Sequence, residues 1–129
     1  MKFPLTILLF IIAIHCSAQE TSADTVYTNV DVHAEYRGGE YAFLHYLDLH
    51  LHYPFDARHN SIQGTVVVEF VVNTDGKVSD VQATGGPTEG GLREEAVRVI
   101  KQSGKWKPVI ADGHPVKSRI HQPIVFTLQ

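Results

Sequence analysis

The clearest pattern in the chain is the strict alternation of side chains over residues 64–72. One face of a strand built from this segment is entirely apolar, with Val66, Val68, Phe70 and Val72. The opposite face is also largely apolar. Because strands covered on both faces lie inside a sheet, we expect this segment to be a central strand.

Two further strands follow from the turns that bound them. Residues 73–76 read Asn-Thr-Asp-Gly, a hairpin signal in which glycine supplies the positive φ, so residues 77–84 should return antiparallel. A second turn at Asp112-Gly113 precedes a last apolar strand, Ile120 to Leu128. A terminal strand often lies at a sheet edge, where unpaired N–H and C=O groups can accept another chain.

Two segments have the period of a helix. Residues 41–53 end at Pro54, which disfavours the helical conformation of the residue before it, and their apolar stripe is Leu44, Leu47 and Leu51. Residues 92–103 end at Gly104, and their apolar side chains are Leu92, Ala96, Val99 and Ile100.

The amino-terminal segment has a different character from the rest. Lys2 precedes an apolar run that is shorter than the roughly 20 residues needed to span a bilayer, and small residues precede Gln19. We expect residues 1–18 to be a cleaved signal peptide, residues 19–29 a short polar tail and residues 30–129 the domain. Lipid attachment at Cys16, or an uncut inner-membrane anchor, are the alternatives.

The net charge and the residue types reduce the number of function classes that the chain can have. The chain of 129 residues has a net charge of −3 and no basic stripe, which argues against nucleic-acid binding. His45, Asp48 and His52 have helical spacing, so a histidine-based metal site is one alternative; we favour a solvated helix face without metal or cofactor. No catalytic motif emerges, so we expect a binding protein and not an enzyme.

Several sequence blocks in a fixed order resemble a known family. They are residues 36–40, 53–54, 64–72, 75–78, 94–100, 105–108, 113–116 and 123–126. In order and spacing the chain is similar to the carboxy-terminal domain of TonB-type energy transducers, in the form common in Bacteroidetes-like bacteria. The resemblance implies an α+β fold, a small antiparallel sheet with two helices packed on one face. It also implies a periplasmic domain that binds an extended segment of an outer-membrane transporter, or of another envelope protein, by strand addition.

From this resemblance and the terminal strand we predict the binding residues. They are Ile124, Val125, Phe126 and Thr127, with Ile124 and Phe126 facing the core and Val125 and Thr127 facing outward. Trp106 is either a core anchor, which we favour, or an aromatic contact for the peptide. The dozen residues before the domain reach at most ~40 Å. We therefore expect an exported, periplasmic protein-binding module associated with transmembrane transport, with the anchored energy transducer as the alternative and a homodimer left open.

Overall fold

The computed structural model describes residues 34–104 and 106–129. The predicted signal peptide, the polar tail and the candidate lipid site at Cys16 lie outside these residues. The described elements, in chain order, are β1 (Glu35–Tyr36), α1 (Glu40–His50), α2 (Phe55–His59), β2 (Gly64–Val72), β3 (Val78–Gly85), α3 (Leu92–Lys101), β4 (Trp106–Lys107), β5 (Val109–Ala111), β6 (His114–Val116) and β7 (Ser118–Phe126).

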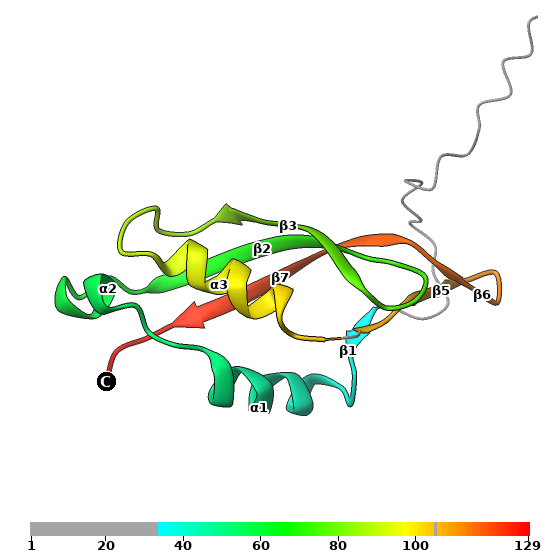
Figure 1. The fold of residues 1–129 in the computed structure, drawn as a ribbon, viewed down its shortest axis with the longest axis horizontal. Coiled ribbons are helices and arrows are strands. Elements are labelled where there is room, and N and C mark those ends of the chain that lie inside the picture. The colour runs from blue at the N-terminus through cyan, green and yellow to red at the C-terminus, as the bar shows by residue number, and fades with distance from the viewer. Residues whose placement is uncertain (1–33, 105) are drawn as a thin grey trace, which may run out of the picture.

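An antiparallel sheet with the strand order β3-β2-β7 forms the centre of the domain (Figure 1). β2 lies between the other two strands, as its two apolar faces predict. It joins β3 through the predicted turn, in which the Asn73 N–H donates to the Lys77 carbonyl at 2.9 Å and the Gly76 N–H donates to the Asn73 carbonyl at 2.8 Å. β7 pairs with β2 along the whole length of both strands.

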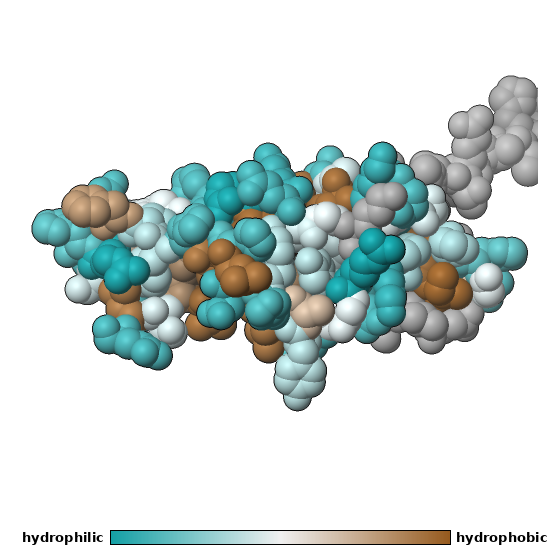
Figure 2. All heavy atoms as spheres, turned by 60° about the horizontal axis from the view of Figure 1, so that its bottom comes forward, coloured by the Kyte–Doolittle hydropathy of each residue, from teal (hydrophilic) through white to brown (hydrophobic). Residues whose placement is uncertain are grey.

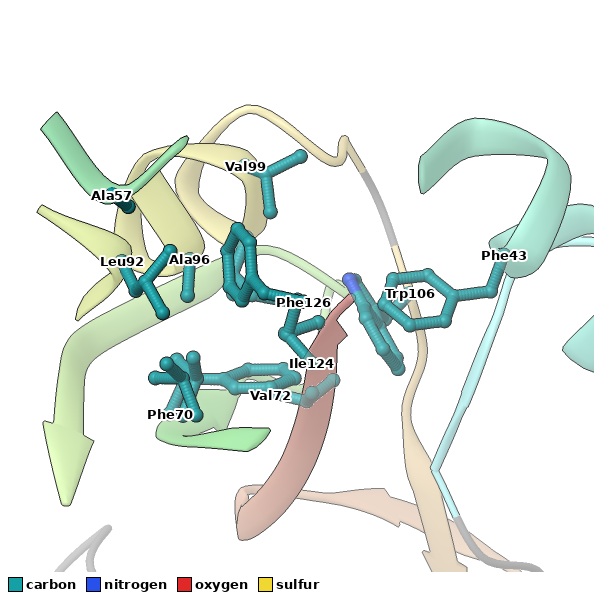
Figure 3. Close-up of a cluster of buried hydrophobic side chains, with 13 residues drawn as sticks. Phe43, Ala57, Phe70, Val72, Leu92, Ala96, Val99, Trp106, Ile124 and Phe126 are labelled. Carbon is teal, nitrogen blue, oxygen red and sulfur yellow. The ribbon is translucent and has the colours of Figure 1, made fainter. Parts of the chain in front are cut away.

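The core lies on one face of this sheet, where the buried side chains of all three described helices converge (Figure 3). The predicted inward face of β2 is fully buried, and so are the four predicted apolar side chains of α3. Phe70, at the centre of β2, lies 5.0 Å from the Trp106 ring, centroid to centroid. The α+β fold with helices packed on one face is therefore confirmed.

The first predicted helix differs from the structure in length and in its buried face. α1 ends at His50, the backbone of Leu51 is extended, and a separate five-residue helix, α2, follows Pro54. Within α1, Phe43 is the buried residue, whereas Leu44 is 53% exposed. The stripe prediction was wrong at Leu44 because α1 carries apolar residues on every side, so leucine spacing alone does not identify the face that packs.

The hairpin turn is fitted closely against β4. Gly76 has a φ of +83°, and a Cβ built on it would lie 2.2 Å from the Trp106 carbonyl oxygen. The Trp106 N–H donates to the Gly76 carbonyl at 2.8 Å. Only glycine combines this φ with this approach, so the turn positions the tryptophan as well as the two strands.

No helix in the described part of the chain is long and apolar enough to cross a membrane.

Candidate functional site

β7 forms one edge of the central sheet. On one side it pairs with β2, and no described strand pairs with its other side. Its register with β2 runs without a shift from Ser118 to Phe126. The strand is therefore a regular, unpaired edge of the kind that a further strand can join.

The alternation of hydrogen bonds in an antiparallel sheet determines which backbone groups of β7 face the open edge. The Val67 carbonyl accepts from the Thr84 hydroxyl of β3 at 3.5 Å, and Asn73, six residues further on, also bonds on the β3 side. Odd-numbered residues of β2 thus direct their backbone groups to β3, and Val67 is paired with Pro123. Because residues directly opposite each other alternate between bonded and non-bonded pairs, odd-numbered residues of β7 direct theirs to the open edge. Pro123, which has no N–H, falls at such a position.

The side chains of β7 divide as predicted. Ile124 and Phe126 are buried against the core, with exposed fractions of 0% and 2%. Val125 is 59% exposed, and Thr127, just beyond the end of the strand, is also exposed. Ile124 and Phe126 therefore hold the strand in place, and Val125 offers both its side chain and its backbone edge.

A trough lies between β7 and α1, and it is made of two adjoining hollows. The first has a volume of about 350 Å³ and is lined by Phe43, Leu44, Leu47, Asp48, Leu51, Gln122, Pro123 and Val125. The second has a volume of about 230 Å³ and is lined by Ala34, Glu35, Tyr36, Glu40, Phe43, Leu44, Trp106 and Gln122. They share Phe43, Leu44 and Gln122, so the trough is continuous beside the open edge.

The wall formed by α1 is the part of the site that the sequence interpretation missed. It gave Leu44, Leu47 and Leu51 as an apolar stripe without assigning them to a binding site. All three side chains line the trough, and Leu47 and Leu51 also pack against the core. Hydrophobic side chains gather over this region in the view that brings α1 forward (Figure 2). The available signal was that a helix with apolar residues on every side has more of them than one packed face can bury.

Trp106 belongs mainly to the core. It is 5% exposed, and its indole N–H donates to the Ser103 hydroxyl at 2.9 Å. Its ring lies 5.3 Å from Phe43 and 5.5 Å from Tyr36, centroid to centroid. The remaining exposed part lines the second hollow, so its predicted contact with a partner remains a prediction.

The carboxyl end of α1 is held to α3 by a charged group. The Arg98 guanidinium donates to the Glu95 carboxylate and to the His50 carbonyl, each at 2.8 Å. The same carboxylate accepts from the His52 N–H at 2.8 Å. The bond to His50 occupies the last carbonyl of α1, and the group as a whole holds the end of the trough wall to α3.

The environment of this group shifts three pKa values. Burial alone would raise the pKa of Glu95, but the hydrogen bonds from Arg98 and the His52 amide outweigh it and hold that pKa below its usual range. The bond to Glu95 raises the pKa of Arg98. Burial raises the pKa of Tyr46, whose hydroxyl donates to the Val99 carbonyl at 2.7 Å.

The candidate metal ligands were His45 and Asp48, in α1, and His52, just beyond its end. Within residues 34–104 and 106–129, no group of three or more His, Cys, Asp or Glu side chains is placed to hold a metal ion. His45, Asp48 and His52 are all exposed, and the His50 ring packs 4.7 Å from Tyr46, centroid to centroid. Nothing in the described structure favours the histidine-based alternative.

Comparisons with known proteins agree with this architecture. The family described as "Gram-negative bacterial TonB protein C-terminal" matches residues 49–128. Protein TonB of Vibrio cholerae is 39% identical over 77 residues, which cover 60% of this chain and 31% of that protein. The chain thus spans less than a third of the length of this relative. The solution NMR structure of the Helicobacter pylori TonB carboxy-terminal domain is similar with a TM-score of 0.51 and 26% identity, over 73% of this chain and 89% of that one. This chain belongs to the family of TonB carboxy-terminal domains of Gram-negative bacteria.

Proposed function

We propose that this chain is an exported, periplasmic TonB-like module that binds an extended segment of an outer-membrane transporter, or of another envelope protein, by adding it as a strand to β7. Family membership supports an envelope function associated with transport. The observation that carries the mechanism is the regular, unpaired edge of β7, whose odd-numbered residues present their backbone groups. The proposal assigns binding and no catalysis.

Val125 provides the most direct test of strand addition. Proline at this position would remove an N–H that faces the open edge and leave the buried Ile124 and Phe126 unchanged. One lost hydrogen bond is worth about 0.5–1.5 kcal/mol, so the affinity should fall roughly three- to tenfold. The measurement is a titration with synthetic peptides from the amino-terminal segments of transporter plugs.

Val125→Ala is the matched control, because it shortens the same side chain and keeps the N–H. Strand addition predicts a larger loss of affinity for Val125→Pro than for Val125→Ala, at equal folded fraction by circular dichroism. Equal affinity in the wild type and Val125→Pro would exclude a backbone contact at this residue. Binding of no plug peptide at all would remove the proposed function.

The proposed location has its own test. Cleavage before Gln19 should give a mature protein whose intact mass lacks residues 1–18. A diacylglycerol or acyl mass on Cys16 would instead identify a lipid-tethered module, and an intact Met1 would identify the anchored transducer.

A further inference from the structure

The trough beside β7 has a chemistry that narrows the class of peptide it can accept. A strand added to β7 would lie about 4.8 Å from it and direct every second side chain to the helix side of the sheet. On that side the trough begins directly at Gln122, Pro123 and Val125. Alternate residues of the peptide would therefore enter the trough, and this inference rests on the proposed function.

The first hollow is suited to an apolar side chain. One wall is formed by Leu44 and Leu47 of α1 and by Leu51, just beyond its end, and the other by Pro123 and Val125 of β7. Leu44 is 53% exposed, so the α1 wall has apolar area for a ligand to cover. An aliphatic side chain that covers it gains roughly 25 cal/mol for each Å² of apolar surface removed from water.

Carboxylates line both hollows and give the trough a negative charge. Asp48 belongs to the first hollow, and Glu35 and Glu40 belong to the second. In the described part of the chain Glu35 pairs with Lys107 at 3.2 Å, while Glu40 and Asp48 form no ion pair. Arg119 of β7 is held by Glu69 at 2.9 Å. An anionic side chain placed here would meet the like charges of Glu40 and Asp48, and a cationic one would meet opposite charges.

Aromatic rings in the second hollow add to this preference. Tyr36 and Trp106 line it together with the two glutamates. A lysine or arginine side chain can lay its methylene stem along such rings while its charged end reaches the carboxylates. The hollow thus combines an apolar wall with an acidic rim.

We propose that the trough selects a cationic–apolar peptide, in which an aliphatic side chain and a lysine or arginine lie on the same face of the added strand. Such residues lie an even number of positions apart (i and i+2, for example), since side chains of a strand alternate between its faces. The shared lining of the two hollows places the aliphatic and the cationic side chain close together along the strand.

Fluorescence anisotropy with the mature full chain tests this selection. The first peptide alternates valine with serine and carries one lysine on the valine face. The second moves that lysine by one position to the serine face, and the third replaces it with glutamate on the valine face. We expect the first peptide to bind at least about fivefold more tightly than the third at low salt, which is the scale of one exposed ion pair. The difference should shrink at 0.5 M salt, where exposed charges are screened.

Variants locate the effect in the trough. Glu40→Gln with Asp48→Asn should abolish most of the preference for lysine over glutamate. The control pair, Glu94→Gln with Asp112→Asn, removes two exposed carboxylates outside the trough lining and should preserve the preference. All four positions are exposed, so melting temperatures should stay near that of the wild type.

The remaining outcomes separate this inference from the proposed function. Equal binding of all three peptides would overturn the selection and leave strand addition standing, whereas binding of none would overturn both. A dimer in light scattering that Leu44→Asp dissociates would assign the trough to a second copy of the chain. Tighter binding of a peptide covering residues 19–33, with its acidic Asp24 and Asp31, would assign it to the chain's own amino-terminal segment. Either result would overturn the proposal.

Discussion

The two edges of the central sheet differ in regularity. β3 pairs with β2 through two register shifts, and Asp80, in the second of them, has a φ of +50°. β7 pairs with the same strand without a shift. Bulges twist an edge and interrupt its row of donors and acceptors, so they protect it from other chains. The same sheet therefore has one edge that resists pairing and one that permits it, and the permissive edge is the one beside the trough.

The largest expected loss of stability comes from a substitution in β2, the strand with which both edge strands pair. Phe70→Ala deletes a fully buried ring from β2, between the two edges, and should cost about 3–5 kcal/mol of unfolding free energy. Urea denaturation followed by circular dichroism measures this cost. An unchanged midpoint would contradict the assignment of Phe70 to the core.

A smaller loss of stability is expected from a substitution in the hairpin turn that joins β2 and β3. Gly76→Ala would place a Cβ 2.2 Å from a backbone oxygen at a residue with positive φ. It should lower the free energy of unfolding by more than about 2 kcal/mol. Gly113→Ala is the matched control, because Gly113 has a φ of +75° but open space around it. It should cost about 1 kcal/mol, the strain alone. If both variants melt alike, the close approach to Trp106 has no energetic consequence.

The stability of the α1 wall of the trough should depend on pH through Glu95, which together with Arg98 holds the end of α1. The pKa of Glu95 is lowered in the folded protein, so its contribution to stability is present above the unfolded-state pKa and disappears as pH falls through the folded-state value. Glu95→Gln should therefore lower the melting temperature at pH 7, by an amount corresponding to about 1 kcal/mol or less. The gap from the wild type should close below about pH 4. A gap that is constant from pH 7 to pH 3 would show that the charge of Glu95 is not responsible.

The smallest effect is expected from two exposed histidines, His45 in α1 and His52 in the segment that follows it. His45→Gln with His52→Gln should change the unfolding free energy by no more than about 0.5 kcal/mol, since both side chains are exposed. Metal analysis of the purified wild type accompanies the thermal melts. Stoichiometric zinc or copper that the double variant loses would restore the metal-binding hypothesis.

Sequence patterns predict the regular parts of this domain better than its binding surface. The alternation around Phe70 and the Asn73–Gly76 turn are local signals, and they correctly predict the central strand and its hairpin. The buried face of α1 is not local, because it depends on Phe43 meeting Trp106, 63 residues later in the chain. The same limit applies to the trough. Its two walls come from distant segments, so Leu47 and Val125 are neighbours only after folding.

Pro123 has a consequence for the behaviour of the protein at high concentration. A long, regular strand edge is a template on which identical copies can stack into insoluble aggregates. The missing donor near the middle of β7 breaks that template for a growing fibril, while positions on either side of it remain usable by a short ligand. The proline therefore lowers the tendency of this edge to stack with identical copies and leaves the backbone groups on either side of it open.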